Sequence, residues 1–228
     1  EGVGFELALL EKYTEKQQLL DAIADADAVI VRSDIVDEEV INAGKKLKIV
    51  VRAGAGYDNV DLEAATRAGV CVMNTPGQNS NAVAELVFGL LVYAVRNFYN
   101  GTSGTELMGK KLGIHAYGNV GRNVARIAKG FGMEVLAYDA YCRAEDIKQE
   151  GVNPTCSVKT LYQGCEIVSV HIPLTSETRQ IINKELLELL PANAVMVNTA
   201  RKEVVNEADL LQHMIDNPKF KYVTDVAP

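Results

Sequence analysis

The stretch from Lys110 to Asp139, KKLGIHAYGNVGRNVARIAKGFGMEVLAYD, decides the fold that we expect for the rest of the chain. An apolar strand over residues 112–116 runs into a turn with Gly118 and Gly121, and a helical pattern follows. A second apolar strand then ends at Asp139. In such a βαβ unit, glycines let the backbone approach a pyrophosphate at a helix N-terminus, and an acid about 20 residues later binds the ribose hydroxyls. The sequence therefore predicts a dinucleotide site here.

One position of this fingerprint departs from the pattern. Ala116 occupies the place of the first glycine. A methyl group there crowds the turn, but Gly118 provides the closest approach of the backbone to the pyrophosphate. We therefore expect the turn to tolerate Ala116, and whether this residue weakens cofactor binding stays open.

Composition excludes several classes of function. The chain has 23 basic and 30 acidic residues, a net charge of −7 and no basic block, so nucleic acid is not expected as a partner. The longest apolar stretch, residues 86–95, is too short to span a bilayer, and no signal-peptide pattern is visible. The four cysteines show neither metal spacing nor a disulfide framework. We expect a cytoplasmic protein with reduced thiols, no metal and no membrane contact.

Strands and helices alternate along the whole chain, which predicts an α/β fold with parallel sheets. Short apolar strands are expected at residues 28–31, 48–51 and 70–73, and also over residues 5–10. Continuous apolar strands of this kind fit burial on both faces. We predict two doubly wound parallel-sheet domains, a flavodoxin-like substrate domain followed by a Rossmann NAD-binding domain.

The predicted boundary between the domains lies in the glycine-rich and polar stretch 100–109. Before it, residues 81–98 form an apolar helix that we expect to be buried between domains or subunits. The first domain then comprises residues 1–98 and the second residues 99–228. We expect both to be incomplete, the second at its C-terminal part, because the strand ending at Asp225 has only the start of its loop after it.

Three arginines stand at the ends of predicted strands: Arg32, Arg52 and Arg201. Arginine binds carboxylate or phosphate through a rigid fork of donors. Their positions predict a small anionic substrate, although each arginine alone could equally form a surface salt bridge.

The chain has three histidines that could serve in acid–base chemistry. His171 closes a predicted strand before Pro173 and is placed at the rim of the expected site. His115 falls inside a strand and is expected to point into packing. His213 lies in an amphipathic helix and is expected on the surface.

The strand-end motifs together resemble one family. They are VRS at 31–33, VRAGAGYDNVD at 51–61, MNTPGQNS at 73–80, AEL at 84–86, GNVG at 118–121, YD at 138–139, VHIPLT at 170–175, VNTAR at 197–201 and DV at 225–226. In this order they are similar to the D-isomer-specific 2-hydroxyacid dehydrogenases, most closely to the D-3-phosphoglycerate dehydrogenase branch. The resemblance covers essentially the whole chain.

The resemblance implies a set of site residues. Arg201 matches the catalytic arginine that holds the substrate carboxylate and carbonyl. Positions that match NAD contacts are Thr75, Gly118, Asn119, Val120, Gly121, Asp139, His171, Thr199, Ala200, Arg201 and Asp225. Positions that match substrate contacts are Arg32, Arg52, Ala53 and Gly54. The family's acid–base histidine and its supporting glutamate fall beyond Pro228, and His171 matches a position near the cofactor that is not the base.

Two departures from the family affect the details. Lys202 and Glu203 follow Arg201 where many members have paired glycines, which makes the nearby loop less certain. The joint at residues 97–105 is shorter than in most members, whose longer segment often supports dimer contacts. The resemblance implies a homodimer, but its geometry stays open.

The function implied is NAD-dependent oxidation of a D-2-hydroxy acid, D-3-phosphoglycerate to 3-phosphohydroxypyruvate first of all, as in serine biosynthesis. Asp139 favours NAD over NADP because its carboxylate would repel a 2′-phosphate. The alternatives are another D-2-hydroxyacid dehydrogenase, or a dinucleotide-sensing binding protein like the family's corepressor branch. We expect these 228 residues alone to show little turnover. The true substrate and any allosteric control stay open.

Overall fold

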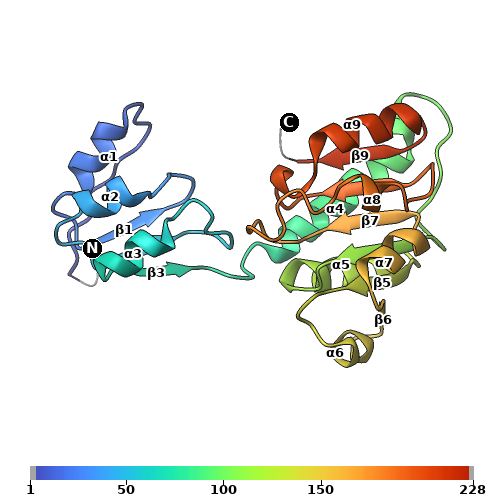
Figure 1. Ribbon diagram of the computed structural model, residues 1–228, viewed down its shortest axis with the longest axis horizontal. Coiled ribbons are helices and arrows are strands. Elements are labelled where there is room, and N and C mark those ends of the chain that lie inside the picture. Colours follow the sequence, from blue (N-terminus) through green and yellow to red (C-terminus); the bar gives the residue numbers. More distant parts are fainter. Residues whose placement is uncertain (1–3, 226–228) are drawn as a thin grey trace. The chain divides into compact units, whose positions relative to one another are not determined.

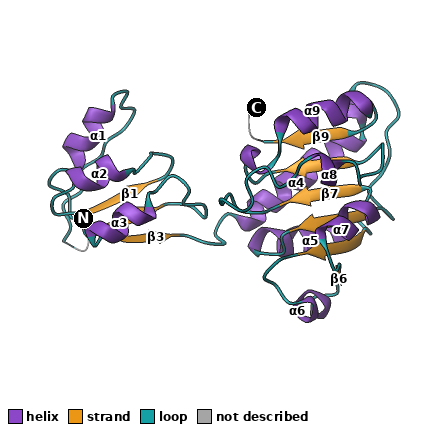
Figure 2. Cartoon of the chain, in the orientation of Figure 1, coloured by secondary structure: helices purple, strands orange, loops and turns teal. Residues whose placement is uncertain are grey.

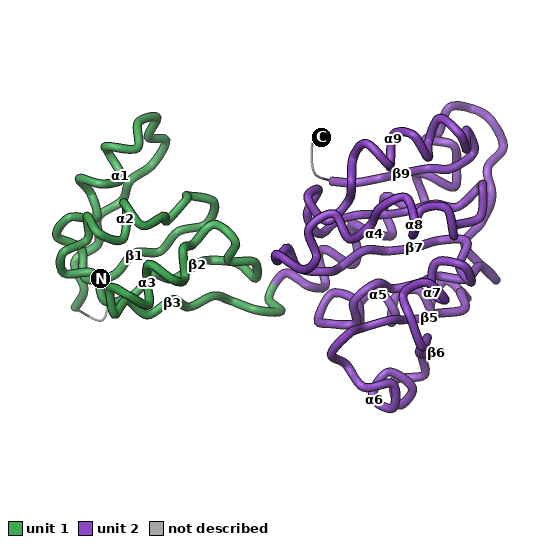
Figure 3. Tube along the Cα trace, in the orientation of Figure 1, with its two compact units in different colours: residues 1–78 green, residues 79–228 purple. Residues whose placement is uncertain are grey.

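A computed structural model of the chain describes residues 4–225. It divides into two compact units, residues 1–78 (unit 1) and 79–228 (unit 2), which Figure 3 distinguishes by colour. Both contain parallel sheets with helical connections, so the predicted α/β fold with parallel sheets is confirmed. None of the helices between residues 4 and 225 combines the length and apolar character needed to cross a membrane.

Unit 1 is built on three parallel strands in the order β1 (Ala28–Val31), β2 (Ile49–Arg52) and β3 (Cys71–Asn74) (Figure 1). Its helices are α1 (Lys16–Ile23), α2 (Glu38–Ala43) and α3 (Leu62–Ala68). Local chemistry fixes their ends. The side chains of Asp37 and Asp61 accept hydrogen bonds from the first turns of α2 and α3, and Gly69 ends α3 in the left-handed region with φ 70°.

The helices of unit 1 share one hydrophobic core with alternate strand residues, among them Val31 and Val50. The opposite face of the sheet exposes Ile30 and Met73, which are 72% and 52% accessible. The strand predicted over residues 5–10 is wrong, because this segment forms no strand and Phe5 is 75% exposed. An apolar run becomes a strand only where a neighbouring strand offers hydrogen-bond partners.

Unit 2 contains a six-stranded parallel sheet in the order β6-β5-β4-β7-β8-β9. The strands are β4 (Lys111–His115), β5 (Glu134–Tyr138), β6 (Asn153–Pro154), β7 (Ile167–Val170), β8 (Val195–Asn198) and β9 (Lys221–Thr224). Strand β4 is the first of these six in the chain, yet it lies in the interior of the sheet. The order therefore reverses between β4 and β7, which is the strand order of a Rossmann domain and the point where such sheets bind ligands.

Two layers of helices cover this sheet (Figure 2). Helices α4 (Ser80–Val95) and α5 (Asn119–Gly130) contribute to one core, which includes Leu112 and Ile114 of β4. Helices α7 (Val158–Gly164), α8 (Lys184–Leu187) and α9 (Glu207–Asp216) contribute to a second core. The shorter elements are α6 (Ala144–Gln149) and the 3-10 turns η1 (Asn97–Tyr99) and η2 (Lys202–Val204).

Helix α4 packs with unit 2, although the domain division from sequence assigned residues 81–98 to the first domain. Its buried face, with Ala84, Val87, Leu91 and others, belongs to the core beside α5. A helix that is apolar nearly all round gives no local sign of the sheet to which it belongs. The compact units divide at residue 78, and the division at 98 stays a prediction about the domains of the whole protein.

Candidate functional site

The turn after β4 has the shape of a pyrophosphate cradle. Ala116 has φ +83°, a left-handed conformation that costs a non-glycine residue about 1–2 kcal/mol. A Cβ on Gly121 would lie 2.5 Å from the Ala116 carbonyl oxygen, so only glycine allows α5 to approach the strand this closely. A Cβ on Gly118 would meet nothing within 4 Å, which leaves space for a ligand on that side.

Helix α5 presents its N-terminus to that space. Gly118 is its N-cap residue and offers no capping side chain. The first intrahelical hydrogen bond is donated by the Arg122 N–H to the Gly118 carbonyl at 3.0 Å. The preceding amides, those of Asn119, Val120 and Gly121, therefore lie at the positive end of the helix dipole, where an anion is favoured.

Asp139 is held rigidly at the end of β5. Its Oδ2 accepts from the Tyr117 N–H at 2.7 Å, and its Oδ1 accepts from the N–H groups of Tyr141 and Cys142 at 2.7 and 2.8 Å. A carboxylate offers about four acceptor positions, so capacity remains for a ribose hydroxyl. The carboxylate therefore joins the glycine turn to the following loop as well as offering a site for the sugar.

His171 follows β7, and its surroundings favour the neutral form of its imidazole ring. Its ring Nε2 lies 2.8 Å from the Ser169 hydroxyl, and its backbone N–H donates to the His115 backbone carbonyl at 2.9 Å. Burial, with a smaller effect from the charge of His115, lowers the pKa of His171 to about 3. Such a side chain is uncharged at neutral pH and is a weak base, and its place beside the cofactor stays a prediction.

The other two histidines lie in packing. His115 is buried as expected, with Nδ1 3.2 Å from the Tyr162 hydroxyl, and burial lowers its pKa to about 4. The prediction that His213 is a surface residue is wrong, because it is 7% exposed. Its ring packs edge-on against Phe220 at 4.8 Å, which covers it from outside its own helix.

The loop after β8 carries Thr199, Ala200 and Arg201, and Asn198 organises it. The Asn198 amide donates to the Arg201 carbonyl at 3.0 Å, and its oxygen accepts from the Ala200 N–H at 3.0 Å. The Thr199 hydroxyl is buried without a hydrogen-bond partner among the described residues, which is expected of a group that awaits a ligand. Sequence reasoning missed the anchoring role of Asn198, although it belongs to the VNTAR motif.

The parallel register brings the predicted NAD positions of unit 2 to one edge of the sheet, the carboxyl edge. They follow β4, β5, β7, β8 and β9: the turn 116–121, Asp139, His171, residues 199–201 and the exposed Asp225. Thr75 lies in unit 1, after β3. Within residues 4–225 no group of three or more His, Cys, Asp or Glu side chains is arranged to hold a metal ion.

Unit 1 gathers the predicted substrate residues at its own carboxyl edge. The Arg32 guanidinium donates to the Ala53 carbonyl at 3.1 Å. The Arg52 side chain lies over Gly54, where an added Cβ would stand 1.3 Å from Nη1. Arg52 Nε is buried without a partner among the described residues. The loop is tied to β3 because the Thr75 N–H donates to the Gly54 carbonyl at 2.9 Å. Two cations therefore flank one short loop.

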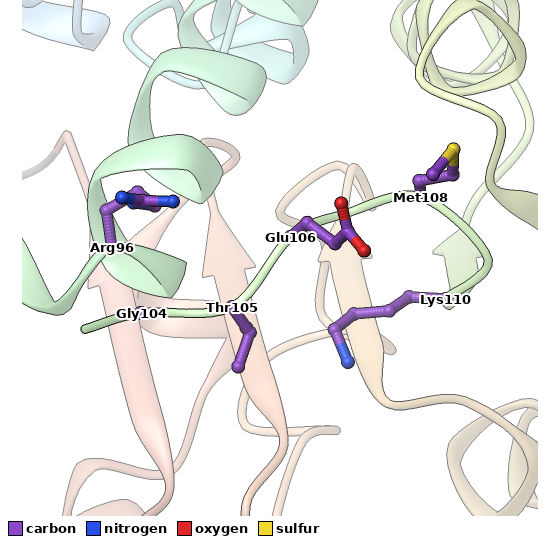
Figure 4. Close-up of a pocket in the computed structure, with 6 residues that line it drawn as sticks. All are labelled: Arg96, Gly104, Thr105, Glu106, Met108 and Lys110. Atoms are coloured by element: carbon purple, nitrogen blue, oxygen red, sulfur yellow. The ribbon is translucent and has the colours of Figure 1, made fainter.

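A pocket of about 450 Å³ lies elsewhere in unit 2 (Figure 4). Its lining residues are Arg96, Gly104, Thr105, Glu106, Met108 and Lys110. Lys110 immediately precedes β4, whereas the glycine turn follows the last residue of that strand. The pocket is thus at the amino ends of the strands and is separate from the candidate cofactor edge.

Comparison with known proteins places the chain. The profile of the D-isomer specific 2-hydroxyacid dehydrogenase NAD binding domain matches residues 92–228. A hydroxypyruvate reductase of Thermotoga maritima is 36% identical over 97% of this chain and 76% of its own length. A D-3-phosphoglycerate dehydrogenase of Methanocaldococcus jannaschii is 39% identical over 86% of this chain, but only 40% of that relative is covered.

A solved structure agrees with these relatives. The crystal structure of NAD+-bound 3-phosphoglycerate dehydrogenase from Entamoeba histolytica has a TM-score of 0.93 and 44% sequence identity, and it covers all of this chain and 73% of its own. A glycine turn that leads into an open helix N-terminus, with an acid after the next strand, is the arrangement that binds a dinucleotide. The chain therefore belongs to the D-isomer specific 2-hydroxyacid dehydrogenase family, with NAD as its cofactor.

Proposed function

We propose that the protein is an NAD-dependent dehydrogenase of D-2-hydroxy acids and that it converts D-3-phosphoglycerate to 3-phosphohydroxypyruvate. The proposal of a phosphorylated substrate rests on one observation: the guanidinium groups of Arg32 and Arg52 lie beside the loop 53–54. The chain spans about two fifths of the D-3-phosphoglycerate dehydrogenases that it resembles, so this activity is a proposal for the whole protein.

The cofactor contacts are proposed for the carboxyl edge of unit 2. When bound, NAD accepts a hydride from C2 of the hydroxy acid. The amides of residues 119–121 would bind its pyrophosphate, and Asp139 would accept from the ribose hydroxyls and exclude a 2′-phosphate by repulsion. Further contacts are proposed from Thr75, Gly118, His171, Thr199, Ala200, Arg201 and Asp225.

Arg201 is the proposed catalytic residue. Its guanidinium would hold the substrate carboxylate and polarise the carbonyl that forms at C2. Asn198 supports this role because its side chain accepts from the Ala200 N–H and donates to the Arg201 carbonyl, which fixes the backbone of this loop. The second proposed carboxylate contact comes from the backbone of Ala53 and Gly54.

Proton transfer needs a group that the 228 residues do not offer. His115 is buried against Tyr162, His213 is buried against Phe220, and the pKa of His171 is lowered to about 3. As the family resemblance implies, we propose that a histidine paired with a glutamate, from chain outside these residues, moves the proton. The 228-residue chain would then bind NAD with little turnover.

We also propose a homodimer in the cytoplasm, without contact to nucleic acid or membrane. Helix α4 supports the dimer because its outer face exposes Leu86 and Tyr93. A Cβ on Gly89, between them, would meet nothing within 4 Å, so another helix could approach closely there. Light scattering at micromolar concentration tests this, with Leu86→Glu expected to give monomers.

Two alternatives remain for the function. Reduction of hydroxypyruvate is favoured by the Thermotoga maritima relative, which carries that activity in its name. A dinucleotide-sensing binding protein would instead associate on adding NADH and show no turnover with any hydroxy acid.

The decisive experiment compares 3-phosphohydroxypyruvate with hydroxypyruvate as substrates of the full-length protein. We expect kcat/KM to be at least about 100-fold higher for the phosphorylated acid, since two arginines for one phosphate each contribute about 1.4 kcal/mol or more. Arg32→Gln should lower kcat/KM about 10-fold for the phosphorylated acid only. Equal use of both acids would favour the reductase, and no turnover would favour the sensing protein.

A further inference from the structure

Tyr117, in the middle of the glycine turn, is held at both ends. Its backbone N–H donates to Asp139 at 2.7 Å, and its hydroxyl donates to Glu150 Oε2 at 2.9 Å. The side chain is 2% exposed, so this phenol–carboxylate bond is shielded from water at its tyrosine end. Through Tyr117, the turn is joined to the loop after β5 and to the end of α6.

Arg122 holds the carboxylate of Glu150 in place. Its guanidinium carbon lies 5.0 Å from the centre of the Tyr117 ring, and its Nη1 forms an ion pair with Glu150. A cation above the ring and beside the carboxylate favours the conformation in which the phenol meets that carboxylate. The backbone carbonyl of Glu150 also accepts from Lys129 Nζ. Glu150 thus contacts residues near both ends of α5.

The turn needs such support because of Ala116. Its φ of +83° is disfavoured for an L-residue, and a strained turn persists only where its surroundings determine it from several sides. Tyr117 follows Ala116 directly, so the bonds that fix Tyr117 also restrict the rotation of Ala116. In a fingerprint with glycine at this position, the same support would have less strain to oppose.

We propose that Glu150 is a positioning residue for the cofactor. Through Tyr117 and Arg122 it holds residues 116–118 in the conformation that leaves the first amides of α5 open to the NAD pyrophosphate. This inference rests on the proposed pyrophosphate contact of the amides of residues 119–121. It adds Glu150, which caps the C-terminal end of α6 and which no motif of the sequence indicated.

The test is the Kd for NAD, measured by isothermal titration calorimetry on the whole chain. We expect Glu150→Ala to raise the Kd about 10-fold and Tyr117→Phe about 5-fold, since each loses a bond to a charged group. Glu150→Gln should lie between wild type and Glu150→Ala, because its amide oxygen still accepts from the phenol. The control is Glu134→Gln, which removes the exposed partner of Lys111 at the opposite end of β4 and β5 and should leave the Kd within about twofold.

A double-mutant cycle with Ala116→Gly distinguishes positioning from general support of the fold. With the strain removed, Glu150→Ala should raise the Kd by no more than about twofold. An equal effect in both backgrounds, or no effect of Glu150→Ala in either, overturns the proposal. If Glu150→Ala does not fold, as judged by thermal melting, Tyr117→Phe with and without Ala116→Gly completes the same cycle. A wild-type chain that binds no NAD would instead overturn the pyrophosphate assignment.

Discussion

The turn after β4 and the loop after β2 each contain a glycine whose side-chain space is occupied, but different neighbours occupy it. At Gly121 the space of a side chain is occupied by the Ala116 carbonyl, a backbone atom that cannot rotate away. At Gly54 it is occupied by the Arg52 guanidinium, the far end of a flexible side chain. In the proposed site, the turn after β4 binds an anion through backbone amides, whereas the loop after β2 binds one through arginine side chains. We therefore expect the cofactor turn to be rigid and the substrate loop to be adjustable.

The largest effect is expected from Gly121→Ala. Its methyl group would force α5 away from β4, with a loss of about 1–3 kcal/mol in the free energy of unfolding and at least about 100-fold in NAD affinity. Urea denaturation and calorimetric titration measure the two losses. The matched control is Gly118→Ala, which meets no neighbour but fills ligand space, so it should weaken NAD binding without loss of stability. Equal stability of both variants would contradict the packing argument.

The two units should also differ in how their free energies of unfolding change as the pH falls. Burial holds the pKa of His115 at about 4 and that of His171 at about 3, below the value of 6.5 expected in the unfolded chain. The unfolded state then binds more protons below pH 6.5, so stability is complete above that pH and is lost as the pH falls toward 3. From pH 7 to pH 5 each histidine should cost unit 2 about 2 kcal/mol, or about 30-fold in its unfolding equilibrium.

Unit 1 contains no histidine and should lose little over the same pH range. Hydrogen exchange followed by mass spectrometry, at pH 7 and pH 5 with correction for the intrinsic exchange rate, resolves the two units. We expect protection to fall in β4 and β7 and to hold in β1 and β2. His171→Gln should flatten the dependence for unit 2. Parallel losses in both units would show that other groups control the acid response.

Gly54→Ala tests whether the substrate loop after β2 is adjustable. The methyl group would displace the Arg52 side chain without moving the strand, so kcat/KM for the phosphorylated substrate should fall about 10- to 30-fold. The Kd for NAD and the thermal midpoint should stay close to those of the wild type. A stability loss as large as that of Gly121→Ala would mean that the loop is as rigid as the cofactor turn.

The smallest change is expected from Asp139→Asn. The amide oxygen can still accept from the Tyr141 and Cys142 N–H groups, but the NH2 group cannot accept from the Tyr117 N–H, and the charge is lost. The Kd for NAD should therefore rise about 5- to 10-fold. NADP should gain relative to NAD, because the repulsion of its 2′-phosphate is removed. Titrations with both nucleotides give the ratio, and an unchanged ratio would exclude Asp139 from the ribose contact.

Much of this architecture could be predicted because its signals are local. The apolar run at 28–31 became β1, and those at 48–51 and 70–73 became β2 and β3 with a shift of one residue. The side chains of Asp37, Asp61 and Ser157 cap helices at the places where those helices begin. The βαβ unit could be predicted for the same reason, since strand, glycine turn, helix and acid follow each other within one short stretch.

The failures involve partners that lie outside the segment itself. Residues 5–10 have the composition of a strand but no neighbouring strand, and His213 has the spacing of a surface residue but lies under Phe220. Neither partner can be identified from the periodicity of the segment itself. The sequence also left open which elements α4 contacts, because a helix that is apolar nearly all round gives no local sign of its neighbours.

The sequence by itself determined the family, the cofactor and the residues at the strand ends, because a dinucleotide is bound by a contiguous stretch of backbone and one acid. Only the tertiary structure decided how those residues are held. It set Asn198 across the loop of Arg201, laid Arg52 over Gly54, and brought Glu150 to the hydroxyl of Tyr117. Of these contacts only that of Glu150 with Tyr117 joins residues far apart in the chain, but the energies of all three depend on distances that only packing fixes.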